Sequence, residues 1–295
     1  MKTKIIQLLK KVFPRLAVTY VRWRSSIPDG RQPMMTPMGF KLIGNPTMES
    51  GSFEPGETKI FLKLLESVDV VINVGANIGY YCCMALQHKK YVVAFEPMAQ
   101  NLNYLMRNVT ANGWQSKIEI FPVALCDKIG VVDIYGGGSG ASMVEAWGGV
   151  SKYFSTLVPC STMDVALGSR FNGQRCLIMA DIEGAEKLML EGASLMFTAR
   201  PKPIWFVEIS ISAHQPGSRR NPNLLSTFEE FWSRGYQAWT THKENRIVTK
   251  DEIEKIISTG IDTLWADTFL FIDKNEHHDF EVLKYLSITT VDHIR

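Results

Sequence analysis

Two glycines follow an apolar run near residue 75, within residues 70–80 (VVINVGANIGY). Glycine lets the backbone turn tightly between a strand and a helix, and it lets a ligand approach closely because no Cβ is present. The spacing is G-x-N-x-G, whereas a dinucleotide pyrophosphate is typically held by G-x-G-x-x-G. The run therefore predicts a nucleoside site without a phosphate at Gly75 and Gly79, which favours S-adenosylmethionine over NAD.

An acidic residue, Glu96, ends the next apolar run, residues 92–97 (VVAFEP). A carboxylate that closes the second strand, roughly 20 residues after a glycine turn, is placed to accept hydrogen bonds from ribose hydroxyls. Pro97 ends the strand and begins the turn towards the next helix. Such a carboxylate by itself could equally be a surface residue, but the preceding glycine turn favours ribose binding.

A third apolar run, residues 177–180, ends in Asp181 and Glu183 and is followed by a glycine. In open α/β sheets, ligands gather at the carboxyl ends of the strands. We therefore expect Asp181 and Glu183 at the reacting end of the pocket. Glu186 is interpreted as a first-turn acid, because the helix dipole favours a negative charge there.

Polar side chains at this edge of the sheet could also act as a general base, which contributes on the order of 10²- to 10⁴-fold where a proton must be removed. The candidate catalytic residues are Asp181, Glu183, Glu208 and His214. Glu208 sits late in an apolar strand, where an unpaired carboxylate is costly, so it binds a ligand or caps a neighbour. His214 follows that strand and lies at the pocket rim, or it is an exposed loop histidine. A divalent metal between Asp181 and Glu208 is an alternative, but no dense acidic cluster demands it and no metal is predicted.

A glycine-rich stretch, residues 136–149, interrupts the pattern of strands and helices. It lacks the Lys-Ser/Thr ending of a phosphate-binding loop. We interpret it as a mobile flap over the acceptor. Trp147 and Met143 within it either contact a substrate ring or form ordinary loop packing.

These residues are positioned by β-branched runs that alternate with helical stretches from about residue 68 onward, which is typical of βαβ units. Seven strands are expected at residues 70–74, 91–95, 118–121, 176–180, 204–209, 236–240 and 268–273. Helices are expected at residues 79–87, 100–112, 185–197 and 224–234. Two further strands are expected around the glycine-rich stretch, at residues 131–135 and 157–161. The predicted fold class is α/β and Rossmann-like, with helices on both faces of a seven-stranded, mainly parallel sheet.

The composition places limits on partners and location. The chain has 295 residues, is 45% hydrophobic and carries a formal charge of only +2, so we expect a packed core and no nucleic-acid partner. The five cysteines form no C-x-x-C pair and no zinc-type spacing, which favours a reducing, cytoplasmic location. Cys82 and Cys83 are expected to pack in the core.

Basic residues gather in residues 1–24, where apolar residues recur at helical spacing. This amphipathic helix either makes weak contact with the anionic inner face of a membrane or packs on the domain. A signal peptide fits poorly, because lysines interrupt the apolar stretch. The expected organisation is a helix and cap segment at 1–55, a catalytic domain at 56–275 and a tail at 276–295.

Taken together, the motifs resemble the FkbM family of methyltransferases. The matching stretches are residues 53–57 (FEPGE), 73–80 (NVGANIGY), 94–97 (AFEP), 121–125 (FPVAL), 180–186 (ADIEGAE) and 207–209 (VEI). The resemblance implies a class I methyltransferase fold and transfer of a methyl group from S-adenosylmethionine to a hydroxyl of a saccharide, glycan or similar metabolite. It also implies a set of cofactor-binding residues: Glu54, Asn73, Gly75, Ala76, Asn77, Gly79, Tyr80, Glu96, Pro97, Ala124 and Asp181.

The sequence departs from the family pattern at two positions. Asn73 stands where the family usually has Asp, and Met179 stands where a Lys usually precedes the Asp-x-Glu pair. Two alternatives stay open. One is an NAD-dependent oxidoreductase, against which the missing third glycine argues. The other is a non-catalytic binding module that keeps the fold.

Overall fold

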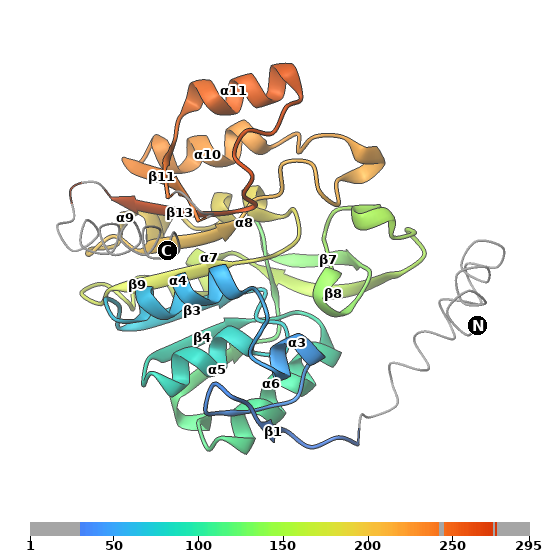
Figure 1. The fold of residues 1–295 in the computed structure, drawn as a ribbon, viewed down its shortest axis with the longest axis vertical. Coiled ribbons are helices and arrows are strands. Elements are labelled where there is room, and N and C mark those ends of the chain that lie inside the picture. Colours follow the sequence, from blue (N-terminus) through green and yellow to red (C-terminus); the bar gives the residue numbers. More distant parts are fainter. Residues whose placement is uncertain (1–29, 242–244, 274, 276–295) are drawn as a thin grey trace, which may run out of the picture.

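The computed structural model describes residues 30–241, 245–273 and 275. An eight-stranded sheet with the order β12-β11-β13-β10-β9-β3-β4-β5 lies at its centre (Figure 1). Its strands are β3 (Val70–Val74), β4 (Tyr91–Phe95), β5 (Ile118–Phe121), β9 (Cys176–Ala180), β10 (Ile204–Glu208), β11 (Tyr236–Thr240), β12 (Ile247–Val248) and β13 (Thr268–Asp273). The strands from β5 to β10 are parallel, and β13 is antiparallel to both of its neighbours. The predicted seven-stranded, mainly parallel sheet is confirmed, and β12 adds a short eighth strand at one edge.

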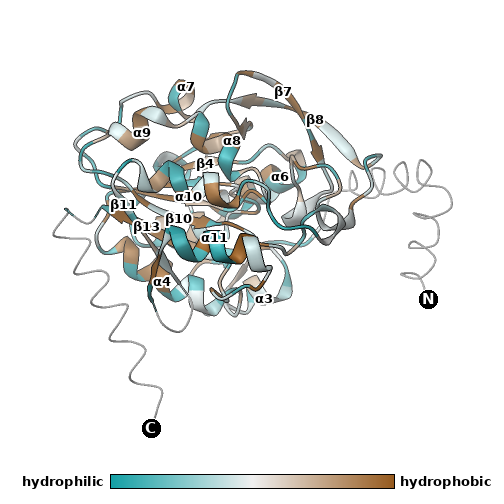
Figure 2. Ribbon diagram, turned by 90° about the horizontal axis from the view of Figure 1, so that it is seen from above, coloured by the Kyte–Doolittle hydropathy of each residue, from teal (hydrophilic) through white to brown (hydrophobic). Residues whose placement is uncertain are grey.

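Helices cover both faces of the sheet, because successive strand residues point to opposite sides. In β3, for example, Val70 and Ile72 belong to one hydrophobic core and Val71 belongs to the other. The core that contains Val71 is closed by α4 (Pro55–Leu65), α5 (Tyr80–Gln87) and α6 (Ala99–Ala111). The opposite core is closed by α7 (Met163–Leu167), α8 (Glu186–Glu191), α9 (Ser194–Thr198), α10 (Leu224–Trp232) and α11 (Lys250–Thr259). Figure 2 shows hydrophobic and hydrophilic bands side by side on α10 and α11, as expected of helices that cover a core.

The helices that cover the sheet differ from the prediction at four places. The single helix expected at residues 185–197 is two short helices, α8 and α9, separated at Gly192. A Cβ at Gly192 would lie 2.3 Å from the carbonyl oxygen of Cys126, so the chain passes too close there for a side chain. Helices α4, α7 and α11 were not predicted. The sequence does contain a signal for the start of α11, because Thr249 and Glu252 have the spacing of a capping box. The Thr249 side chain accepts a hydrogen bond from the amide of Glu252 (3.3 Å).

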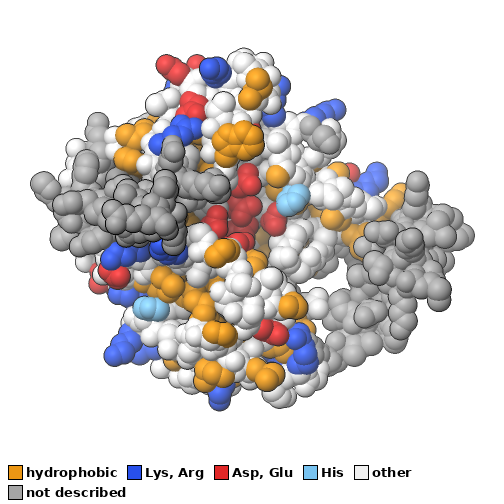
Figure 3. Space-filling model, viewed as in Figure 1, with side chains coloured by type: hydrophobic (Ala, Val, Ile, Leu, Met, Phe, Trp, Pro, Cys, Tyr) orange, Lys and Arg blue, Asp and Glu red, His pale blue; other side chains and the backbone are white. Residues whose placement is uncertain are grey.

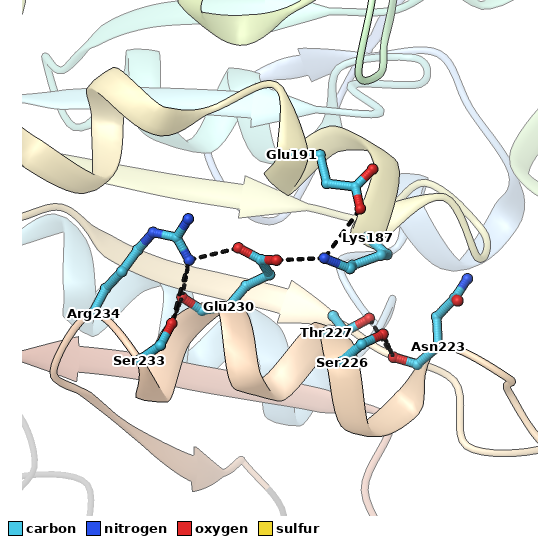
Figure 4. A network of polar contacts seen from close by, with 8 residues as sticks. All are labelled: Lys187, Glu191, Asn223, Ser226, Thr227, Glu230, Ser233 and Arg234. Atoms are coloured by element: carbon cyan, nitrogen blue, oxygen red, sulfur yellow. Dashed lines mark hydrogen bonds and ion pairs between the residues drawn. The ribbon is translucent and has the colours of Figure 1, made fainter.

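An ion-pair network joins α8 to α10 (Figure 4). Glu230 of α10 binds Lys187 of α8 and also Arg234, whose Nη1 lies 2.5 Å from it. Lys187 also binds Glu191, at 3.1 Å. Because α8 begins directly after the segment that carries Asp181 and Glu183, this network holds the end of that segment against the helical layer.

A second, three-stranded sheet with the order β6-β8-β7 stands beside the central one (Figure 1). It consists of β6 (Ala124–Leu125), β7 (Gly130–Tyr135) and β8 (Ser155–Ser161). The two further strands expected around the glycine-rich stretch are β7 and β8. They belong to this separate sheet, which carries residues 136–154 as its connection.

The N-terminal part of the described chain packs on α6. It contains β1 (Met34–Met35), β2 (Lys41–Leu42) and α3 (Pro46–Glu49). The Asn108 side chain accepts a hydrogen bond from the Ile43 amide (2.8 Å) and donates one to the Ile43 carbonyl (3.1 Å). The basic helix expected in residues 1–24 and the tail at 276–295 lie outside the described residues.

The described part of the chain contains no helix that is both long and apolar enough to cross a bilayer. Cys82 and Cys83 are 0% exposed, so their predicted core packing is confirmed.

Candidate active site

A cavity with an empty volume of about 570 Å³ opens at the carboxyl ends of β3, β4 and β9. This is the edge of an open α/β sheet at which ligands bind. Its lining contains three acidic residues, Glu96, Asp181 and Glu183, and none of the described residues that line it is Lys, Arg or His. The site therefore suits a ligand that is neutral or positively charged.

The glycine turn forms the floor of this cavity at Gly75. Gly75 has a φ of +81°, and a Cβ there would lie 1.9 Å from the carbonyl oxygen of Asp181. The amides of Gly75 and Ala76 both donate to the Phe95 carbonyl, at 3.0 and 2.9 Å. Gly79 does not line the cavity, since a Cβ there would lie 2.4 Å from Leu105 of α6. One predicted glycine thus forms the cradle, and the other allows α5 and α6 to pack.

Glu96 is fixed at the cavity wall by three hydrogen bonds. Its Oε2 accepts from the Asn77 amide (2.8 Å), and its Oε1 accepts from the Met98 amide (2.8 Å) and from Asn101 Nδ2 (3.2 Å). Glu96 is only 4% exposed, and this burial raises the pKa of its carboxyl, while the three hydrogen bonds act in the opposite direction. A carboxylate oxygen can accept more than one hydrogen bond, so lone pairs remain for the hydroxyls of a ligand.

The other predicted cofactor residues divide into two groups. Asn77, Pro97 and Ala124 line the cavity. The residues that do not line it are Asn73, Ala76, Gly79, Tyr80 and Glu54. Asn73 donates to the sulfur of Cys82 (3.4 Å), and the Tyr80 hydroxyl donates to the sulfur of Met38 (3.3 Å).

Asn101 was missed from the sequence. It holds Glu96 and also donates to the Gly138 carbonyl (3.2 Å), so it connects α6 to the glycine-rich stretch. An asparagine in the first turn of a helix gives no signal of such a role.

Four carboxyl groups form what we call the acidic cluster: Glu54, Asp181, Glu183 and Glu208. Val207 pairs with Ala180 across the parallel strands β10 and β9, so Glu208 and Asp181 follow at neighbouring strand ends. Figure 3 shows acidic side chains gathered in a hollow on this face, with a histidine beside them. No three His, Cys, Asp or Glu side chains within the described ranges are arranged to hold a metal ion.

Burial and the charges of neighbouring acids raise the pKa values of Asp181, Glu208 and Glu54 in this cluster. Burial raises the pKa of Asp181 well above its usual range, and the charges of Glu183 and Glu54 add to the effect. The Oδ1 atom of Asp181 is buried without a hydrogen-bond partner in the described part of the chain. Burial and the charges of Asp181 and Glu183 raise the pKa of Glu208 to about 10. Burial is also the main cause that raises the pKa of Glu54.

Trp147 positions Glu183. Its Nε1 donates to Glu183 Oε2 at 2.6 Å, and the Ser142 hydroxyl donates to the Glu183 carbonyl at 2.5 Å. The indole packs on Gly184, where a Cβ would lie 2.5 Å from the ring. Trp147 is 3% exposed, so of its two interpretations the structure supports loop packing, whereas Met143 does line the cavity. The glycine-rich stretch is therefore attached to the segment after β9 and is not a free flap.

His214 lies at the rim of the cluster. Its Nδ1 is 3.8 Å from Glu183 Oε2, its ring centroid is 6.1 Å from that of Trp147, and its side chain is 64% exposed. The Gly148 amide donates to the His214 carbonyl at 2.6 Å, which ties the two loops together. His214 is therefore an exposed loop histidine that also lies beside Glu183 of the acidic cluster.

Glu186 behaves as the helix-start acid that was predicted. Its Oε1 accepts a hydrogen bond from the Gly184 amide (3.0 Å) at the beginning of α8. It is 2% exposed, and this burial raises its pKa to about 7.

The sheet order, the two helical layers and the cavity over the first glycine turn define a class I methyltransferase fold. The model of the methyltransferase FkbM domain matches residues 73–238, more than half of the 295-residue chain. The chain therefore belongs to the FkbM methyltransferase family.

Among solved structures, the chain is similar to the methyltransferase FkbM from Methylobacillus flagellatus KT, with 19% identity and a TM-score of 0.44 over 70% of this chain and 44% of that one. It therefore spans less than half of that protein's length. It is also similar to an O-methyltransferase from Bacillus cereus in complex with SAH, with 10% identity and a TM-score of 0.40 over 91% of this chain and 96% of that one. A third structure is the precorrin-6y C5,15-methyltransferase from Geobacter metallireducens GS-15, with 10% identity and a TM-score of 0.37 over 79% and 91% of the two chains. None of the curated proteins matches the chain.

Proposed function

We propose that this protein is an S-adenosylmethionine-dependent O-methyltransferase that acts on a hydroxyl of a saccharide, glycan or similar hydroxylated metabolite. The observation that carries the proposal is the cavity over Gly75, with Glu96 fixed in its wall and no basic residue among the described residues of its lining. The family supports methyl transfer. The proposal adds that the acceptor of the methyl group is a hydroxyl.

The residues present fit this cofactor better than they fit NAD. The lone pairs of Glu96 suit ribose hydroxyls, and the apolar side chains of Phe95, Ile134 and Met143 suit an aromatic base. The unpartnered Oδ1 of Asp181 suits a cationic group. A pyrophosphate would meet acidic residues and no compensating positive charge, which argues against the oxidoreductase alternative.

When bound, S-adenosylmethionine supplies a methyl group on a sulfonium. Transfer of that methyl group to an acceptor hydroxyl would also require a group of the protein to take the proton of this hydroxyl. Because burial and neighbouring acids raise the pKa of Glu208 to about 10, this group is a poor acceptor for the proton near neutral pH. The pKa of Asp181 is raised in the same direction. We assign the base to His214, because the Glu183 carboxylate, 3.8 Å from Nδ1, stabilises the imidazolium that forms.

Calorimetric titration with S-adenosylhomocysteine tests the cofactor assignment without an acceptor. We expect binding by the native protein and no binding of NAD. Glu96→Ala should lose about 1.5 to 3 kcal/mol of binding free energy, roughly 10- to 150-fold in affinity, because it removes charged hydrogen bonds. Glu66→Ala, at a side chain that is 65% exposed, is the matched control. Undiminished affinity in Glu96→Ala would remove the basis of the proposal.

Turnover is tested by incubation with deuterated-methyl cofactor and a pool of glycans, read by mass spectrometry. Label on a sugar oxygen supports the proposal. Binding of S-adenosylhomocysteine without any label would favour the non-catalytic binding module.

A further inference from the structure

One tryptophan lies exposed beside the acidic cluster. Trp265, in the connection from α11 to β13, is 76% exposed and has a φ of +53°. Its neighbours Leu264 and Ala266 are 4% and 8% exposed and belong to the core. A left-handed backbone is strained for a bulky residue, and an indole in water forgoes the free energy of burial. Packing therefore does not account for Trp265.

The loop that carries Trp265 is pinned on both sides. Asp262 Oδ1 accepts from the Trp265 amide (3.3 Å) and from the amide before it (2.8 Å). The Thr263 carbonyl accepts from Arg246 Nη2 (2.9 Å), and the two guanidinium nitrogens of Arg246 each lie 2.7 Å from a carboxylate oxygen of Glu252. A two-point ion pair of this kind fixes geometry as well as adding energy. The backbone that carries the indole is thus held in a set position, which lowers the entropic cost of binding a ligand there.

The pinned loop lies at the same sheet edge as the cluster. The Ile209 amide donates to the Asp267 carbonyl (2.6 Å), and Glu208 pairs with Thr268 in the ladder between β10 and β13. Burial and the charge of Asp262 raise the pKa of the Asp267 carboxyl, while the charge of His214 lowers it. In Figure 3, apolar side chains border the acidic hollow.

We propose that Trp265 is a specificity-determining residue that stacks on the apolar face of an uncharged pyranoside while the acidic cluster binds the hydroxyls of that ring. The inference rests on the proposed function and defines its acceptor further. A pyranose has a C–H face that suits a flat indole, and hydroxyl edges that suit carboxyl groups able both to donate and to accept. The negative charge of Glu183 disfavours uronic acids and sugar phosphates.

The test follows the indole N–H resonance of Trp265 by NMR in protein saturated with S-adenosylhomocysteine. The signal is assigned by its loss in Trp265→Phe. The probes are the methyl pyranosides of glucose, galactose, mannose and fucose, with methyl glucuronide as the anionic partner of the glucoside. We expect at least one neutral pyranoside to shift the signal with a millimolar dissociation constant. The glucuronide should bind at least about fivefold more weakly, or about 1 kcal/mol.

Two variants separate stacking from a structural role. Because Trp265→Ala lacks the reporting indole, its pyranoside affinity is measured from the NMR signals of the sugar, in parallel with the native protein. Trp265→Ala should weaken the responding pyranoside about tenfold or more, while the affinity for S-adenosylhomocysteine stays unchanged. Ile261→Ala, at a residue of the same loop that is 65% exposed, should change neither affinity. No shift with any of the four pyranosides would overturn the inference, as would equal affinity in Trp265→Ala or a shift caused only by anionic lipid vesicles. Pyranoside binding without S-adenosylhomocysteine binding would count against the proposed function and in favour of this inference.

Discussion

The two halves of the candidate site contain buried carboxyl groups that differ in their hydrogen-bond partners. At the ends of β3 and β4, Glu96 accepts three hydrogen bonds, two of them from backbone amides. At the ends of β9 and β10, Asp181 Oδ1 has no partner in the described chain, and the pKa of Glu208 is raised to about 10 by burial and by neighbouring acids. The carboxyl group of the first half therefore has hydrogen-bond partners without a ligand, whereas Asp181 Oδ1 in the second half has none in the described chain.

This difference indicates which half of the candidate site is preformed. Backbone amides hold Glu96 in place whatever occupies the cavity, so cofactor binding requires little rearrangement there. The acidic cluster stores unfavourable electrostatic free energy, because like charges share a poorly solvated site. A ligand that brings positive charge or hydroxyl groups relieves part of this cost, so binding energy is available at the reacting half.

The largest effect, on both stability and ligand binding, is expected from adding a side chain at Gly75 in the preformed half. In Gly75→Ala, the new Cβ would lie 1.9 Å from the Asp181 carbonyl oxygen, in a backbone with φ of +81°. Overpacking and left-handed strain together should cost on the order of 3 kcal/mol or more of the free energy of unfolding, measured by urea denaturation. Binding of S-adenosylhomocysteine should be lost.

Gly130→Ala is the control for this substitution, because nothing lies within 4 Å of its Cβ position. If the two variants unfolded at the same urea concentration, the turn would have room for a side chain and the first half would not be as tightly closed as the structure indicates.

A medium effect is expected from removing one acid of the cluster. The pKa of Glu208 is raised from 4.5 to about 10, so the folded protein holds a proton that the unfolded chain releases. The stability that this proton contributes is full below about pH 4.5 and is lost as the pH rises towards about 10. Glu208→Gln cannot lose a proton and should be more stable than the native protein by about 1 to 2 kcal/mol near pH 8, but not near pH 4.

Urea denaturation across this pH range measures the difference. Glu66→Gln, at an exposed position, should show no such pH-dependent gain. A Glu208→Gln variant that is destabilised equally at both pH values would mean that its carboxylate is satisfied by a partner, and the contrast between the two halves would disappear.

Much of the fold and of the preformed half could be predicted because the signals are local. The strand bounds of the central sheet follow from short β-branched runs, and Gly75 and Glu96 follow from one turn and one strand end. Asn73 was placed in the cofactor site only by resemblance. The alternation of strand residues already argues against it, because Val74 lines the cavity and the residue before it must face the opposite layer.

The acceptor half could not be predicted in the same way, because segments distant in the sequence create it. Trp147 and Trp265 both occur in irregular segments, and nothing local distinguishes them. The structure packs Trp147 on Gly184 and leaves Trp265 exposed, at 3% and 76%. The raised pKa of Asp181 likewise depends on Glu54, which joins the cluster only after folding.

The smallest effect tests whether the cluster responds to the charge that distinguishes cofactor from product. S-adenosylmethionine carries a sulfonium charge that S-adenosylhomocysteine lacks. Because the pKa of Glu208 is raised to about 10, the cluster gains negative charge as the pH rises towards that value. The ratio of the two affinities should therefore shift towards S-adenosylmethionine by about three- to tenfold between about pH 8 and about pH 10, or about 0.7 to 1.4 kcal/mol. Calorimetry with both ligands measures it, and the shift should shrink in Glu208→Gln. A ratio independent of pH would place the sulfonium away from the acidic cluster and separate the two halves more completely than we infer.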